Sequence, residues 1–449
     1  NDGPGVLAVA WHTAGLIDPV LIVLKINKPF VFAGRQDVLT GPIIGFWGRR
    51  MGVQPLLRQA ERMRGFVDDE VATRVNNASM LTVASKLAHG QASILLPEGH
   101  SHSESHIIRL RTGPVRSALN AAALAREIGN DVPVILPVGL TFRDPHAWFS
   151  EVLVEFAEPI HLPQLPDKNH GAKLLAGEWV EPDKETTITV RNEMRDRLGY
   201  LTPDAPDIDT WRAWLLLGHL DAGLTGKRLT TWQQEVLNGR AIRDKMRGST
   251  NKVWQGPEAC GEEDLAATSE LTEPARKAAK TLHEMGLDAR ASHPDSTKIN
   301  WKNIVLALVL TPLIVLALPF TIVGNGIQSL FGLLLAKFNG EAVDKRTTFH
   351  MMSIVLGTVF IRPLIHFSTA LVLLRMGFFL EYSAYIMAPT LVIFLWIITD
   401  VSAFVCRGFL RITIDIRRNI RTYSLSHTKS WDSLRVEFDN LSEMLGALK

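Results

Sequence analysis

Three long apolar tracts after residue 300 constrain this chain more than any other feature of its sequence. No charged residue occurs between Lys302 and Lys337, and residues Ile304 to Val323 are almost entirely Leu, Val, Ile and Ala. Two further tracts run from Met351 to Leu374 and from Tyr382 to Cys406. About 20 apolar residues suffice to cross the hydrocarbon core of a bilayer, so these tracts predict membrane helices. The alternative is a helical bundle buried in a large soluble core.

The first tract carries Pro312, Pro319 and the break Gly324-Asn325-Gly326. We expect them to split one long helix into two shorter pieces, which makes a re-entrant hairpin as plausible as a simple span. Four charged residues interrupt or flank the later tracts, and a lone charge inside a bilayer is costly: Arg362, Arg375, Glu381 and Asp400.

Basic residues follow the first and third tracts and favour the cytosolic side, with its anionic headgroups: Lys337, Lys345, Arg346, Arg407, Arg411, Arg417, Arg418 and Arg421. We therefore expect an integral membrane protein whose active site faces the cytosol, in the endoplasmic reticulum or a bacterial cytoplasmic membrane.

Apolar residues near the end of the chain recur at spacings of three and four: Trp431, Leu434, Phe438, Leu441, Leu445 and Leu448. The pattern predicts either a short coiled-coil seam, through which a homodimer could form, or an amphipathic helix docked on its own domain.

Composition excludes several classes of protein. The 449 residues, 46% of them hydrophobic, predict more than one structural unit. A formal net charge of +2 excludes an overall polycation, and we expect no nucleic-acid partner. Two distant cysteines, Cys260 and Cys406, exclude a disulfide framework or zinc ribbon and favour a reducing compartment.

The first 165 residues predict an α/β domain. Short apolar runs alternate with helical stretches such as Leu81 to Leu87 and Val115 to Arg126, which indicates a mostly parallel sheet with helices on both faces. The predicted strands are Val6 to Ala10, Pro29 to Ala33, Ala92 to Leu96, Val134 to Gly139 and Val152 to Phe156. Because the chain begins at Asn1 and enters a strand almost at once, we expect a natural N-terminal segment to precede it.

We divide the chain into four parts. Residues 1–165 form the α/β domain, residues 166–300 a charged helical extension, residues 301–410 membrane-embedded helices or re-entrant hairpins, and residues 411–449 a basic segment with an amphipathic or coiled-coil helix.

His12 directly follows the first predicted strand, where α/β proteins place their ligands. Asp18 precedes Pro19, which predicts an N-cap followed by proline at the first helical position. The turn can then fold the carboxylate back to the imidazole and form a general base. The alternative is a structural histidine beside an unrelated N-cap.

A second segment reads Leu96-Pro97-Glu98-Gly99-His100-Ser101-His102, followed later by Leu110-Arg111-Thr112-Gly113-Pro114. Gly113 permits a close backbone approach, Pro114 suits the first turn of a helix, and the free N–H groups of that turn with Arg111 predict a phosphate site. The alternative is an ordinary helix start beside a solvated arginine.

Together these segments resemble the glycerophosphate acyltransferase superfamily. His12 and Asp18, separated by five residues, resemble the branch of fungal-type and bacterial glycerol-3-phosphate acyltransferases. Gly52 followed by Arg58, the Pro97-Glu98-Gly99 segment with Ser101-His102, and Pro137 within Val134 to Leu140 resemble the later signatures. Leu96 replaces an aromatic residue, Arg111 a lysine and His100 a small residue.

The resemblance implies transfer of a fatty acyl chain from an acyl thioester, acyl-CoA or an acyl-carrier protein, to glycerol 3-phosphate, with no cofactor and no metal. His12 is the implied base and Asp18 orients it. The implied substrate-binding residues are Arg58, Pro97, Glu98, Gly99, Ser101, Arg111, Gly113 and Pro137. Backbone N–H groups near the His12 turn are candidates for stabilising the oxyanion. Implied partners are the phosphorylated acceptor, the acyl donor and membrane lipid.

Three other functions stay open. The acceptor could be lysophosphatidate, with phosphatidate as product. The crowded residues His100, His102, Glu104 and His106 could instead hold a metal and indicate a hydrolase. The third is a non-catalytic membrane scaffold that dimerises through its C-terminal helix.

Overall fold

The computed structural model describes residues 3–36, 39, 44–50, 52–57, 68–145, 150–247, 262–338, 350–351, 353–377 and 384–447. The chain forms two compact units. The first comprises residues 1–143, 152–208 and 248–261, and the second comprises residues 144–151, 209–247 and 262–449. The predicted four-part division stays a prediction.

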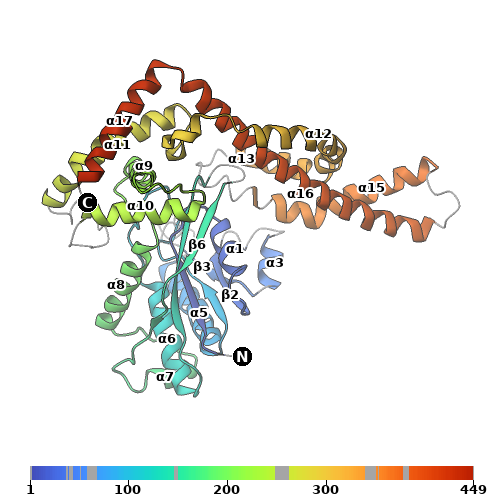
Figure 1. Cartoon of the computed structure of the whole chain (residues 1–449). Coiled ribbons are helices and arrows are strands. Elements are labelled where there is room, and N and C mark those ends of the chain that lie inside the picture. The colour runs from blue at the N-terminus through green and yellow to red at the C-terminus, as the bar shows by residue number, and fades with distance from the viewer. Residues whose placement is uncertain are drawn as a thin grey trace. The chain divides into compact units, whose positions relative to one another are not determined.

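The first unit is built on one mixed sheet (Figure 1). Its main path has the order β3-β2-β4-β1-β5-β6, and β7 pairs with β5. Pairing is parallel from β3 through to β5, whereas β6 and β7 run antiparallel to β5. The mostly parallel α/β fold is therefore confirmed. The strands are β1 (Val6–Ala10), β2 (Phe30–Arg35), β3 (Gln54–Leu56), β4 (Ala92–Ile94), β5 (Val134–Phe142), β6 (Val152–Phe156) and β7 (Ile160–His161).

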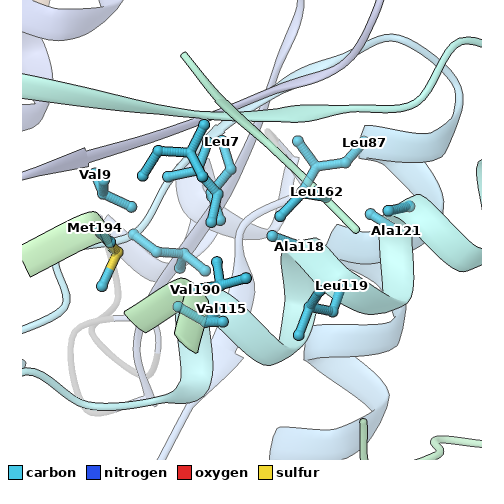
Figure 2. Packing of buried hydrophobic residues seen from close by; sticks show 14 of the residues in the cluster. Leu7, Val9, Leu87, Val115, Ala118, Leu119, Ala121, Leu162, Val190 and Met194 are labelled. Atoms are coloured by element: carbon cyan, nitrogen blue, oxygen red, sulfur yellow. The ribbon is translucent and has the colours of Figure 1, made fainter. Parts of the chain in front are cut away.

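Alternate residues of β1 face the two sides of this sheet, because successive side chains of a strand point in opposite directions. Leu7 and Val9 belong to the larger core cluster, whereas Ala8 and Ala10 pack in a smaller cluster with Ile22 of α1. Figure 2 shows Leu7 and Val9 close to side chains of α5, α6 and α8. Helices therefore cover both faces. Those of this unit are α1 (Ile17–Val23), α3 (Ile44–Arg50), α5 (Asp69–Ala88), α6 (Gly113–Glu127), α7 (His170–Leu175) and α8 (Lys184–Tyr200).

The described residues of the second unit are mostly helical. It contains α9 (Ile208–Leu224, with Ile208 in the first unit), α10 (Trp232–Arg247), α11 (Glu262–Glu284), η2 (Ala289–Ser292), η3 (Pro294–Thr297), α12 (Trp301–Thr321), the π-helical turns η4 (Ile322–Gly326) and η5 (Gly357–Ile361), α13 (Ile327–Phe338), α15 (Arg362–Arg375), α16 (Ala384–Leu425) and α17 (Lys429–Ala447).

Three stretches of this unit are long and apolar enough to cross a membrane: Trp301–Leu334, Ser353–Arg375 and Ile386–Leu425. They overlap the three predicted tracts and agree with membrane association, whereas the compartment and the cytosolic orientation stay predictions. Pro312 and Pro319 lie inside α12 and do not end it. The Gly324-Asn325-Gly326 segment lies in the π-helical turn η4, which continues directly into α13, so the predicted split into two separate helices is wrong.

Two of the charged residues in the apolar tracts pair with each other. The Arg362 guanidinium lies 2.7 Å from Oδ1 of Asp400, donates to the Trp396 carbonyl and covers the Trp396 ring. Pairing reduces the cost of holding a charge among apolar helices. Glu381 lies outside the described residues.

The apolar residues of the predicted C-terminal seam are buried by another helix of the same chain. Trp431, Leu434, Phe438, Leu441 and Leu445 of α17 are buried, and α17 packs against α11, whose Leu271 and Leu282 are also buried. The docked-helix interpretation therefore accounts for the pattern, and homodimerisation through these residues is left without support. Leu448 lies outside the described residues.

Candidate active site

His12 and Asp18 meet at the carboxyl end of β1. Nδ1 of His12 lies 2.8 Å from Oδ2 of Asp18. The same oxygen accepts the backbone N–H groups of Thr13 and Ala14 at 3.0 Å each. A carboxylate only accepts hydrogen bonds, so Nδ1 carries the proton and Nε2 is the ring nitrogen with a free lone pair. Asp18 is fully buried and His12 is 9% exposed, which keeps bulk water from competing for this contact.

The predicted N-cap at Asp18 is wrong. Helix α1 begins at Ile17, with Leu16 at the N-cap and Asp18 in the first turn. The Asp18 side chain accepts N–H groups from the preceding loop instead of those of its own helix. The carboxylate still reaches the imidazole because this loop turns tightly around it.

The turn also leaves fewer oxyanion donors than expected. The N–H groups of Thr13 and Ala14 donate to Asp18, and the His12 N–H donates to Oε2 of Glu98 at 2.9 Å. All three groups are therefore already satisfied by carboxylates and would have to be released before they could bind an oxyanion.

The Pro97-Glu98-Gly99 segment follows β4 and reaches the same edge of the sheet. Strands β1 and β4 are parallel neighbours, so their carboxyl ends lie side by side. Glu98 is 2% exposed, and its Oε1 accepts the Ile108 N–H at 3.1 Å. The His102 N–H in turn donates to the His12 carbonyl at 3.1 Å. The loop after β4 therefore holds the His12 backbone on both sides.

Arg111 lies directly over Gly99. The Arg111 N–H donates to the Pro97 carbonyl at 2.8 Å, and a Cβ added at Gly99 would come within 2.6 Å of Nε of Arg111. Gly99 also has φ +81°, a conformation that residues with a Cβ rarely adopt. The Pro97-Glu98-Gly99 segment and the segment around Arg111, which together make up the predicted phosphate site, are therefore in contact. The Arg111 side chain is exposed and packs on the backbone of Gly99.

Gly113 begins α6, as predicted, and Pro114 lies in its first turn. However, a Cβ at Gly113 would meet only Cε of Met80, at an ordinary distance of 3.6 Å. A close approach of a ligand to the Gly113 backbone stays a prediction, whereas the tight contact at Gly99 is with the Arg111 side chain.

The remaining predicted residues are Arg58, Ser101 and Pro137. Arg58 lies outside the described residues, although the backbone of Leu57 before it is bonded on both sides to the Asn76 amide. Ser101 is half-buried in the loop after Gly99. Pro137 is buried within β5 opposite Val9, and a direct contact with substrate stays a prediction for it.

The crowded histidines after Gly99 do not form a metal site. Nδ1 of His106 contacts the Ala205 carbonyl at 3.1 Å, while Nε2 of His102 lies 2.8 Å from Oε1 of Glu98. Across the described residues, which include His100, His102, Glu104 and His106, no group of three His, Cys, Asp or Glu side chains is placed to hold a metal ion. The metal-dependent hydrolase hypothesis therefore lacks its site.

The sequence did not predict that His102 belongs to this site. Its Nδ1 accepts the Glu104 N–H at 3.2 Å, so the ring proton of the neutral imidazole is on Nε2, which lies 2.8 Å from Oε1 of Glu98 without being aligned for a hydrogen bond. Its ring also lies edge-on to buried Trp11. The spacing of four residues between Glu98 and His102 was the available signal, but it is common in solvated loops.

Comparison with known proteins agrees with this geometry. Residues 1–141 match the family model described as Acyltransferase. The resemblance to the acyltransferase superfamily is thus confirmed. An uncharacterized acyltransferase of Schizosaccharomyces pombe is 27% identical over 128 residues, which are 28% of this chain and 17% of that protein. Glycerol-3-phosphate O-acyltransferase 1 of Saccharomyces cerevisiae is 34% identical over 79 residues, 17% of this chain and 10% of the yeast enzyme.

These two alignments cover well under a quarter of each relative. They support an acyltransferase domain around His12 and Asp18, within the span that the family model matches. The acceptor and the donor of this chain are therefore proposals.

Proposed function

We propose that this chain transfers a fatty acyl chain from an acyl thioester to a hydroxyl group of glycerol 3-phosphate, forming lysophosphatidate. The observation that carries the proposal is the buried contact of 2.8 Å between Nδ1 of His12 and Oδ2 of Asp18. This contact leaves Nε2 free to accept a proton, as a general base requires.

The chemistry balances without an acyl-enzyme. Nε2 of His12 takes the proton of the acceptor hydroxyl while the hydroxyl oxygen attacks the thioester carbonyl carbon. The tetrahedral intermediate then collapses, its carbon–sulfur bond breaks, and the departing thiolate takes the proton back from the imidazolium. Asp18 stabilises the imidazolium between these two steps, because its carboxylate lies against Nδ1.

Arg111 supports a phosphorylated acceptor. The guanidinium lies over Gly99, close in sequence to the start of α6, and no acidic side chain has a described contact with it. A guanidinium and the N–H groups of a helix start suit the phosphate of glycerol 3-phosphate. Arg58 is a second proposed phosphate ligand. The name of the yeast relative points to the same acceptor.

The apolar helices of the second unit support a lipid-associated setting for the donor and product. Three stretches long and apolar enough to cross a membrane fit an enzyme whose acyl chain comes from, or returns to, a bilayer. Acyl-CoA is the proposed donor, with an acyl-carrier protein as the other thioester of that class.

Product analysis tests the proposal. The purified chain is incubated with labelled glycerol 3-phosphate and acyl-CoA of several chain lengths, and in parallel with lysophosphatidate, and the products are identified by mass. We expect lysophosphatidate from the first incubation. Phosphatidate formed only in the second would assign the chain to the later acylation step, and no acylated product from either would reject the proposed function.

A further inference from the structure

The arrangement of α12 beside α16 bears on how the second unit meets a membrane. The two helices run antiparallel. At one end the Asn300 N–H donates to Oδ1 of Asn419 at 2.8 Å, and at the other Oγ1 of Thr321 donates to Sγ of Cys406 at 3.3 Å. A Cβ at Gly324 would meet Thr399. Residues 300–324 therefore lie beside residues 399–419 along the common axis.

Helix α12 is apolar on all sides and has little protein cover. Only 6% of its most apolar window is buried within the chain. The exposed fractions of its side chains include 67% for Leu308, 68% for Val309, 64% for Val315 and 70% for Leu316. Soluble proteins rarely expose so continuous an apolar surface, so lipid is the solvent that this helix requires.

The stretch of α16 beside it carries charge instead. Five arginines and one aspartate occur between residues 407 and 421. The Arg411 side chain is 72% exposed, with its guanidinium 3.5 Å from Glu151, and Arg418 lies 3.3 Å from Asp415. Arg407 and Arg417 are also exposed.

These two observations conflict if α12 crosses the bilayer. At about 1.5 Å per residue its 21 residues would fill a hydrocarbon core of about 30 Å. Asn419 is level with Asn300 and Cys406 with Thr321, so Arg407 and Arg411 lie alongside α12. Their exposed guanidinium groups would then lie at the depth of the acyl chains, where charged groups are rare and costly. A bilayer-crossing α12 is thus incompatible with its own neighbour.

We infer that α12 and residues 403–421 of α16 lie along the membrane interface, with α12 in the acyl region and the arginines at the level of anionic phospholipid headgroups. Amphipathic pairs of this kind bind in the interface plane, where long arginine side chains reach the phosphates. The apolar first half of α16 is free to take a different depth.

An open groove on α16 supports the same ligand. It is lined by Thr413, Ile416, Arg417, Ile420, Arg421, Ser424 and Leu425. Arg417 and Arg421 are one turn apart, with apolar Ile416 and Ile420 beside them. Two arginines and several apolar side chains lining one groove suit a phosphate headgroup and the start of its acyl chains.

This inference is independent of the proposed function, because it uses no residue of the acyltransferase domain. Its test uses the full chain with Cys260 and Cys406 changed to Ser, carrying Lys302→Cys and Gly408→Cys together. These two positions lie near opposite ends of the α12–α16 pair, and a Cβ at Gly408 meets nothing within 4 Å. Sealed vesicles are treated with a membrane-impermeant maleimide, and the labels on each molecule are counted by mass.

An interfacial pair gives molecules with zero or two labels, whatever the orientation of each molecule in the vesicle. A bilayer-crossing pair gives molecules with one label, which would overturn the inference. The matched control, Lys302→Cys with Ser424→Cys, places both thiols at the same end and gives zero or two labels in either arrangement. Detergent-solubilised samples of both variants should carry two labels.

A second experiment tests the headgroup. Arg407, Arg411, Arg417 and Arg421 are changed together to Gln or, as the charge-preserving control, to Lys. Retention of phosphatidylglycerol relative to phosphatidylcholine is then measured by native mass spectrometry. We expect the preference to fall by about tenfold or more in the Gln variant and to persist in the Lys variant. Persistence in the Gln variant, or displacement of the lipid by inorganic phosphate alone, would contradict the headgroup assignment.

Discussion

The backbone N–H of His12 donates to Oε2 of Glu98 across 86 residues of sequence, at 2.9 Å. The other oxygen of Glu98 accepts the Ile108 N–H and lies 2.8 Å from Nε2 of His102. Glu98 therefore contacts the backbone of His12, the proposed base, as well as the loop of the proposed phosphate site. Its position indicates that it holds His12 in place for proton transfer.

Changing Glu98 to Gln tests this positioning role. The amide keeps the shape of the side chain but replaces one acceptor oxygen by a donor, which would face either the His12 N–H or the Ile108 N–H. We expect kcat to fall by about tenfold to a hundredfold with little change in KM for the acceptor. Steady-state kinetics with varied acceptor measure both. A raised KM at unchanged kcat would place Glu98 in acceptor binding instead.

Gly99→Ala should disturb the proposed phosphate site through Arg111. The new Cβ would lie 2.6 Å from Nε of Arg111 and would displace the guanidinium. We expect KM for the phosphorylated acceptor to rise about tenfold or more, as in Arg111→Ala, while KM for the acyl donor stays close to that of the wild type.

Gly129→Ala is the matched control for this change. Gly129 also has a positive φ, +72°, but a Cβ there meets nothing within 4 Å. It shares the backbone strain and lacks the contact with Arg111. Equal effects of the two substitutions on acceptor KM would show that strain, not the guanidinium, is responsible.

Stability of the first unit should depend on pH through His170. Burial lowers the pKa of His170 from its ordinary value of 6.5, with nearby Lys173 acting in the same direction and Asp167 opposing. Nε2 of His170 contacts the buried Asn120 amide oxygen at 2.7 Å. The unfolded state takes up the proton more readily, so this contribution is complete above pH 6.5 and is lost as the pH falls toward the folded-state pKa.

His170→Gln should remove part of that dependence. The Gln amide can still donate to Asn120 but does not titrate. We expect urea unfolding at pH 7.5 and pH 5.5 to show a smaller loss of unfolding free energy in the variant than in the wild type. An identical loss in both proteins would show that other groups carry the acid sensitivity.

Sequence reasoning predicted the strands that lie within apolar runs of five or more residues, including β4, which is itself only three residues long. The bounds of β1 and β6 are as predicted, and β5 continues three residues beyond its predicted end. It missed β3 and β7, because three and two residues are too few to show an alternating pattern. The proline residues of α12 suggested breaks that the helix does not have, since a neighbouring helix, α16, supports it.

For the site, spacing predicted the contact between His12 and Asp18 but not its local geometry. Asp18 looked like an N-cap because Pro19 follows it, yet its carboxylate is taken by the N–H groups of Thr13 and Ala14. The Glu98 side chain accepts the backbone N–H of His12, which lies in the loop after a different strand. No residue pattern in the sequence predicts such a contact. The overlap of Gly99 with Arg111 likewise depends on the path of the loop between them.

The most direct test of the central claim compares acyl transfer by the wild type and by His12→Asn, with labelled glycerol 3-phosphate and acyl-CoA under identical conditions. We predict that kcat falls by about 10²–10⁴-fold in the variant, because Nε2 of His12 is the group that is proposed to take the hydroxyl proton. Acyl transfer at the wild-type rate by a folded His12→Asn variant would contradict the account.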